Sequence, residues 1–132
     1  MGGDSSTGPA RAKLRVLVID DEALIGKAIA RTLTAYAIAS ETRGSGAIER
    51  LARGERFDVI LLDLLMPDLS GMEVYAEVEK RWPELVRGVV VMTAAPVRPE
   101  LKSFLDRIPN LWLRKPFSSK ELEAAVETAS TR

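Results

Sequence analysis

Three short, almost continuously aliphatic segments constrain the fold of this chain most strongly. They cover residues 14–19, 57–62 and 89–92, and segments with helical periodicity lie between them. A strand that is buried on both faces of a sheet needs such an uninterrupted apolar run, whereas a strand with one wet face alternates. Alternating strands and helices favour a parallel sheet with right-handed crossovers. The sequence therefore predicts a doubly wound α/β fold.

The remaining elements complete five strand–helix units. Weaker strands are expected over residues 36–40 and 111–114, and apolar stripes predict helices over residues 25–33 and 48–52. Ser70 and Glu73 have the spacing of a capping box, as do Ser118 and Glu121, so helices are expected to start at these two places. A short helix is expected after Pro99, because proline suits the first helical position.

Length and composition indicate one domain without an affinity for polyanions. The chain has 132 residues, of which 46% are hydrophobic, and 19 Lys and Arg balance 19 Asp and Glu. This length suits a single core over residues 14–132, and the Gly- and Ser-rich residues 1–13 predict a flexible linker or tail. The charge balance argues against direct nucleic-acid contact, and the lack of a long apolar span predicts a cytoplasmic domain without membrane contact.

Polar side chains follow four of the five predicted strands. Asp20 and Asp21 come after the first strand, Asp63 after the third, Thr93 after the fourth and Lys115 after the fifth. The carboxyl ends of parallel strands share one edge of the sheet, where ligands bind in open α/β folds. Each residue alone has an ordinary explanation as a turn residue, a solvated lysine or an acid in the first turn of a helix. Together they predict a binding site.

The chemistry of this set indicates phosphoryl transfer with a metal ion. Carboxylates held close together repel one another unless a cation is present, and Mg²⁺ prefers hard oxygen ligands. We expect Asp21 and Asp63 to bind Mg²⁺ directly and Asp20 to reach it through water. Asp63 is then the candidate nucleophile, since an aspartate can carry a covalent phosphoryl group. Histidine and cysteine are absent, which excludes histidine-based catalysis and thiolate metal sites.

These residues resemble those of response-regulator receiver domains in two-component systems. The resemblance rests on RVLVIDDE, FDVILLDLLMPDLSG, VVVMT and LRKPF, with 30 residues from Asp63 to Thr93 and 22 from Thr93 to Lys115. It implies the flavodoxin-like receiver fold, with five helices and the strand order 2-1-3-4-5. It also implies that Asp63 is phosphorylated and that Asp21, Asp63 and the backbone carbonyl of Leu65 bind Mg²⁺.

The resemblance also implies how the domain responds to phosphate. Thr93, Ala94 and Lys115 are expected to contact the phosphoryl group, and Pro116 is a candidate for a cis peptide bond or a turn. Trp112 stands where the family has an aromatic switch residue, yet alternation with its neighbours equally suits a packing or partner contact on an edge strand. Because Leu65 and Ala95 are apolar, we expect a comparatively long-lived phosphoaspartate.

The expected donor is a phosphohistidine on a histidine kinase or a histidine phosphotransfer domain. The stretch from Thr93 to LRKPF most resembles receivers at the C-terminus of hybrid sensor histidine kinases, and a stand-alone response regulator is the alternative. The domain is expected to be a monomer or weak dimer that assists its own phosphorylation and dephosphorylation without being a conventional enzyme. An Mg²⁺-dependent aspartyl-phosphate phosphohydrolase fits less well, because Leu65 stands where one such family needs a second aspartate. A dinucleotide-binding module is also disfavoured, because this chain lacks the glycine signature of such modules after its first strand.

Overall fold

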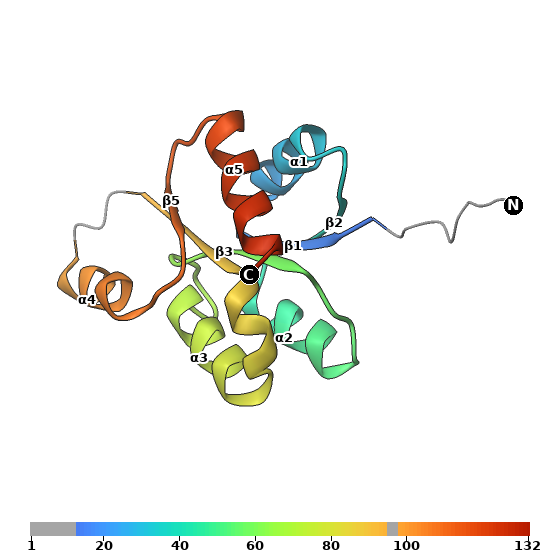
Figure 1. Cartoon of the computed structure of the whole chain (residues 1–132). Coiled ribbons are helices and arrows are strands. Elements are labelled where there is room, and N and C mark those ends of the chain that lie inside the picture. The colour runs from blue at the N-terminus through green and yellow to red at the C-terminus, as the bar shows by residue number, and fades with distance from the viewer. Residues whose placement is uncertain (1–12, 95–97) are drawn as a thin grey trace, which may run out of the picture.

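A computed structural model describes residues 13–94 and 98–132 as one five-stranded sheet with helices on both faces (Figure 1). The strands are all parallel and lie in the order β2-β1-β3-β4-β5, which confirms the predicted topology. Their bounds are β1 (Arg15–Ile19), β2 (Ala37–Glu41), β3 (Val59–Asp63), β4 (Val89–Thr93) and β5 (Trp112–Arg114). The linker predicted for residues 1–13 falls almost wholly outside the described residues, and Ala95 does so too.

The described residues also form five α-helices and one 3₁₀ helix, of which all but the last, α5, connect successive strands. They are α1 (Ala23–Thr32), α2 (Gly44–Ala52), α3 (Gly71–Arg81), η1 (Pro83–Gly88), α4 (Pro99–Arg107) and α5 (Ser119–Ser130). Both predicted capping boxes are confirmed: the Ser70 Oγ accepts a hydrogen bond from the Glu73 amide at 3.2 Å, and the Ser118 Oγ accepts one from Glu121 at 3.0 Å. The sequence did not predict η1, which begins at Pro83 directly after α3.

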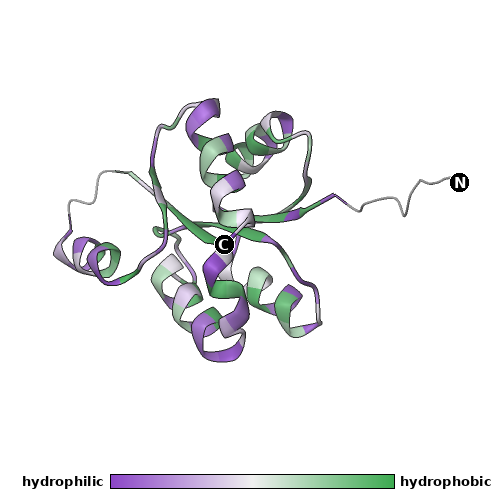
Figure 2. Ribbon diagram, in the orientation of Figure 1, coloured by the Kyte–Doolittle hydropathy of each residue, from purple (hydrophilic) through white to green (hydrophobic). Residues whose placement is uncertain are grey.

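The sheet divides the core into two apolar layers, as the green strands between the helices in Figure 2 indicate. Alternate strand residues point to opposite faces. Val16, Val18 and Leu61 pack with α1 and α5, while Leu17, Ile19 and Leu62 pack with α2, α3 and α4. The central strands β3 and β4 are buried throughout, which explains their unbroken aliphatic runs.

This arrangement brings the carboxyl ends of β1, β3, β4 and β5 to one edge of the sheet. Ile19 pairs with Leu62 and Asp63 pairs with Met92, so the residues that follow these strands lie side by side. None of the helices within the described parts of the chain is long and apolar enough to cross a membrane.

Candidate functional site

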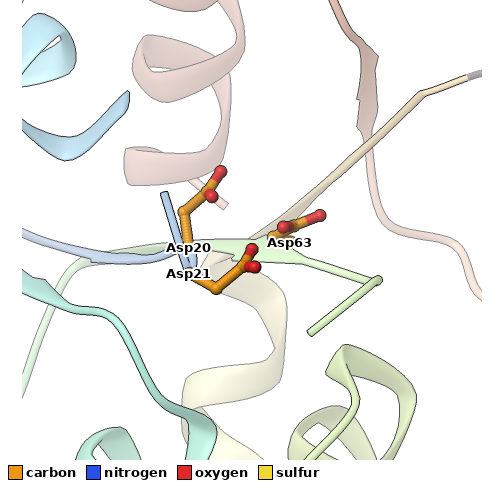
Figure 3. Close-up of side chains that lie close together, drawn as sticks. All are labelled: Asp20, Asp21 and Asp63. Atoms are coloured by element: carbon orange, nitrogen blue, oxygen red, sulfur yellow. The ribbon is translucent and has the colours of Figure 1, made fainter. Parts of the chain in front are cut away.

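Three carboxylates gather where β1 and β3 end. Figure 3 shows Asp20 and Asp21 extending from the end of β1 and Asp63 from the end of β3. Each offers one oxygen atom such that the three atoms lie within 4.8 Å of one another. Asp20 and Asp63 are buried, whereas Asp21 is exposed. Three acids at this separation repel one another, and their oxygen atoms are ligands that suit a hard divalent cation.

Asp20 and Asp21 do not lie in the first turn of a helix, which was the ordinary explanation for these two acids. The helix begins only at Ala23, and its first turn holds no acidic residue. Asp20 instead has two specific contacts: its Oδ1 accepts a hydrogen bond from the Glu22 amide at 2.9 Å, and its Oδ2 accepts one from Lys115 Nζ at 2.7 Å. The acids are therefore held at the sheet edge and do not serve to stabilise α1.

Lys115 supplies the positive charge of the cluster and is not a solvated surface lysine. Its Nζ lies 3.6 Å from Asp63 Oδ2, and its side chain is only 20% exposed. Burial lowers the pKa of this ammonium group, but the hydrogen bond that it donates to Asp20 and the charge of Asp63 outweigh burial and raise the pKa above its usual value. The Lys115 backbone amide also donates to the Thr93 carbonyl at 2.7 Å, which fixes β5 against β4 at this edge.

Asp63 is held in a position that disfavours its own negative charge. Burial, followed by the charge of Asp20, raises the pKa of the Asp63 carboxyl from 3.8 to about 6, and Lys115 offsets part of this effect. Its Oδ1 accepts a weak hydrogen bond from the Leu65 amide at 3.3 Å. A buried carboxylate with this environment gains stability when a cation approaches.

Thr93 ends β4, the strand next to β3, and Ala94 follows it at the same edge of the sheet. Thr93 is 1% exposed, and among the described residues its buried Oγ1 has no hydrogen-bond partner. A buried hydroxyl without a partner is destabilising, so this atom points to a ligand that accepts or donates a hydrogen bond there. Ala94 is exposed and follows directly.

The other predicted residues lie around this centre. Leu65 is 40% exposed beside Asp63, and the Lys115–Pro116 peptide bond is cis. Trp112 is 41% exposed on β5, while the adjacent Leu113 is buried against α5. In this state the indole therefore lies outward on the edge strand, and its role as a switch residue stays a prediction.

Sequence reasoning missed the contribution of Gly71 to the site. A Cβ at Gly71 would overlap the Asp63 carbonyl oxygen and approach the Leu64 Cα to 2.6 Å, while its amide donates to the Leu64 carbonyl at 3.1 Å. The first residue of α3 thus packs directly against the strand end that carries Asp63. The only signal was a glycine immediately after the cap residue Ser70, and that signal does not specify a close backbone contact.

Comparison with known proteins places this chain in a family. The model of the response regulator receiver domain matches residues 16–127. The chain therefore belongs to the response regulator receiver domain family, and this membership disfavours the phosphohydrolase alternative.

Two curated relatives of this chain are named as regulators. The chain is 31% identical to "Response regulator MprA" of Mycobacterium leprae over 90% of this chain and 52% of that protein. It is 30% identical to "Transcriptional regulatory protein PdtaR" of Mycobacterium tuberculosis over 100% of this chain and 64% of that protein. The chain thus spans about half to two thirds of the length of these relatives.

Solved structures share the same architecture. A CheY-like receiver domain protein from Methanospirillum hungatei has a TM-score of 0.80 at 20% identity, covering 91% of this chain and 95% of that one. The receiver domain of sensor histidine kinase PA1611 from Pseudomonas aeruginosa has a TM-score of 0.78 at 24% identity, covering 92% and 100%. These two likenesses concern the fold alone.

Proposed function

We propose that this receiver accepts a phosphoryl group on Asp63 from a phosphohistidine of another protein and passes the signal on by a change of conformation. The observation that carries the proposal is the buried Asp63 carboxylate beside Lys115 and the unpartnered Thr93 hydroxyl. A nucleophile, a cation and a hydrogen-bond donor thus stand at the carboxyl ends of the neighbouring strands β3, β5 and β4. The chain itself has no histidine, so the donor residue belongs to a partner, a histidine kinase or a phosphotransfer domain.

In the transfer step, an oxygen of the Asp63 carboxylate attacks phosphorus while the phosphorus–nitrogen bond to the donor imidazole breaks. The imidazole nitrogen keeps the bonding electron pair and takes up a proton. Catalysis of such a transfer consists mainly of in-line positioning and neutralisation of the phosphoryl oxygens. Lys115 is placed to neutralise one oxygen atom and the Thr93 Oγ1 to donate a hydrogen bond to another, with Ala94 beside them.

The three carboxylates fit a magnesium ion. Asp21, Asp63 and the backbone carbonyl of Leu65 would bind it directly, and Asp20, whose oxygens already accept from Glu22 and Lys115, would reach it through water. When bound, Mg²⁺ neutralises charge on the acids and on the phosphoryl oxygens. The PA1611 receiver, described with a magnesium ion coordinated in its active site cleft, supports this assignment.

The surface next to the site suits a helical partner. Leu24 on α1 is 75% exposed, and an apolar groove of about 420 Å³ runs between α1 and the start of α5, lined by Ile25, Ala28 and Phe117. Because Lys115 lines the same groove, a partner seated there lies within reach of the acids. We propose that the donor docks on this face of a monomer or weak dimer in the cytoplasm.

We propose two alternatives for the full-length protein that contains this receiver. The names of the curated relatives favour a receiver that belongs to a response regulator, whereas the PA1611 likeness is compatible with a hybrid histidine kinase. In either form we propose that the receiver itself does not bind nucleic acid, because its charges balance.

Radiolabelled transfer from a phosphorylated histidine phosphotransfer domain tests the proposal. The wild-type chain should acquire a hydroxylamine-labile phosphate only when Mg²⁺ is present. Asp63→Asn should acquire none, and Asp106→Asn, which changes an exposed acid of α4, should match the wild type. Label on Asp63→Asn at the wild-type rate would refute the assignment of the acceptor.

A further inference from the structure

A second buried polar cluster lies on the α3 and α4 side of the sheet and takes no part in the proposed chemistry. The Tyr75 hydroxyl donates a hydrogen bond to Asn110 Oδ1 at 2.7 Å. The Asn110 amide group donates in turn to the carbonyl oxygens of Val86 at 2.8 Å and Val89 at 2.9 Å. Tyr75 is 4% exposed and Asn110 is 8% exposed. The side-chain oxygen and both amide hydrogens of Asn110 are thus used within an otherwise apolar core.

This cluster joins four parts of the chain that are distant in sequence. Tyr75 belongs to α3, Val86 to η1 and Val89 to β4, while Asn110 lies between α4 and β5. Polar groups that are buried and fully hydrogen-bonded fix one arrangement, because any displacement leaves a donor or acceptor without a partner. The segment before β5, which contains Asn110, is therefore held against α3 by these hydrogen bonds.

The same tyrosine also holds the C-terminal half of α4. Its ring packs edge-on against Phe104, with centroids 5.3 Å apart and planes at 89°. Phe104 is 4% exposed, and the adjacent Leu105 is buried as well. Aromatic pairs in this geometry add to the stabilisation from burial. Tyr75 thus contacts both the end of α4 and the segment that follows it.

The N-terminal end of α4 is held mainly by one apolar side chain, that of Leu101, which is 1% exposed and packs in the same core layer. Its cap residue Arg98 makes no side-chain cap hydrogen bond within the described residues, and residues 98–100 are exposed. In the part of the chain that the structure describes, the ion pair of Arg98 is with Glu100, at 3.9 Å and with both side chains exposed, and such pairs contribute little. This end also lies nearest in sequence to Thr93 at the phosphate site. Within the described residues, the C-terminal end of α4 therefore has the Tyr75–Asn110 cluster beside it as well as apolar packing, whereas the N-terminal end has the apolar packing of Leu101 without such a cluster.

We propose that the Tyr75–Asn110 hydrogen bond is the fixed pivot of α4. It holds the C-terminal half of the helix and the start of β5 to α3, so that the N-terminal half moves when Asp63 takes a phosphoryl group. The direction of movement rests on the proposed function, whereas the anchoring itself does not. Tyr75 is a positioning residue in this account, and it touches neither the acids nor the phosphate.

Hydrogen exchange measured by mass spectrometry on the whole chain tests the pivot. The wild type is compared in Mg²⁺ alone and in Mg²⁺ with beryllofluoride, together with Tyr75→Phe and the control Tyr36→Phe. Tyr36 is partly buried and packs against the other apolar layer, away from the Tyr75–Asn110 cluster. Asn110→Ala is a second variant that removes all three hydrogen bonds of the cluster.

In the wild type, beryllofluoride should change exchange in residues 98–103 and leave residues 104–112 as they are. Tyr75→Phe should speed exchange in residues 104–112 at least tenfold and extend the response to beryllofluoride into them, since local opening sets the exchange rate. Asn110→Ala should enlarge both effects, and Tyr36→Phe should match the wild type.

Two results would overturn the pivot. One is a wild-type response that is as large in residues 104–112 as in residues 98–103, and the other is unchanged exchange of residues 104–112 in both Tyr75→Phe and Asn110→Ala. If beryllofluoride alters no segment, including those that carry Asp63 and Thr93, the acceptor assignment fails. The proposed pivot then fails as well. If Tyr75→Phe still speeds exchange tenfold in that case, Tyr75 stabilises the fold by packing and has no part in a response to phosphate.

Discussion

The Asp63 side chain is buried and has two acidic neighbours, Asp20 and Asp21. Its negative charge therefore destabilises the folded protein when no metal cation is bound. The raised pKa means that, between pH 4 and 6, the folded protein keeps a proton that the unfolded chain has already released. The contribution of Asp63 to stability is therefore greatest below about pH 3.8 and is lost as the pH rises through about 6.

Asp63→Asn should accordingly stabilise the metal-free protein at pH 7.5, by about 2–3 kcal/mol for a shift of this size. Urea unfolding at several pH values measures the difference between the variant and the wild type. That difference should be small at pH 4, grow between pH 4 and 6, and shrink again when Mg²⁺ is added. A difference that does not vary with pH would contradict the account.

We expect Leu65 to influence how easily water reaches the proposed phosphoaspartate. Its apolar side chain is 40% exposed next to Asp63 and offers no group that could orient a water molecule. Leu65→Asn should therefore shorten the half-life of the phosphorylated protein several-fold, as measured by loss of label after removal of the donor. Leu24→Asn, which changes an exposed leucine on α1, is the control and should leave the half-life unchanged.

At the scale of single elements, α3 shows how a helix start can control a site. Gly71→Ala places a methyl group against the Asp63 carbonyl, and such overpacking costs about 1–3 kcal/mol. Ser70→Ala removes the cap of the same helix and costs about 1 kcal/mol without a clash. Both variants should unfold more readily, but only Gly71→Ala should weaken Mg²⁺ binding measured by calorimetry. Equal Mg²⁺ affinities would show that Gly71 acts on stability alone.

Most elements could be predicted from local patterns, and the exceptions have physical reasons. The aliphatic runs of β3 and β4 and the capping boxes at Ser70 and Ser118 are short-range signals, and all of them are found in the structure. The 3₁₀ helix η1 could not be predicted, since a proline after a helix usually marks only its end.

Site residues at strand ends followed from the topology, because parallel strands bring their carboxyl ends together. The contact of Gly71 with Asp63 and the Tyr75–Asn110 bond depend on three-dimensional packing between distant segments, which no local pattern specifies. The outward position of Trp112 was one of two arrangements that alternation allowed.

For the whole molecule, magnesium should act as a stabilising ligand. Binding to the folded state alone adds about 2.7 kcal/mol at a hundredfold excess over Kd. The melting temperature of the wild type should therefore rise with Mg²⁺ concentration. Asp21→Asn should lose most of this rise, because Asp21 belongs to the acidic cluster and is one of the proposed direct ligands of Mg²⁺. An equal rise in both proteins would place the ion elsewhere.

The sheet also separates the proposed donor groove from α4, the helix that we propose to move on phosphorylation. The groove beside α1 lies on the layer shared with α5, whereas α4 packs on the opposite layer with α2 and α3. A protein that recognises α4 would not compete for space with a donor seated on α1. Loading and reading of the domain can then overlap in time, so the speed of signalling would not depend on how quickly the donor leaves.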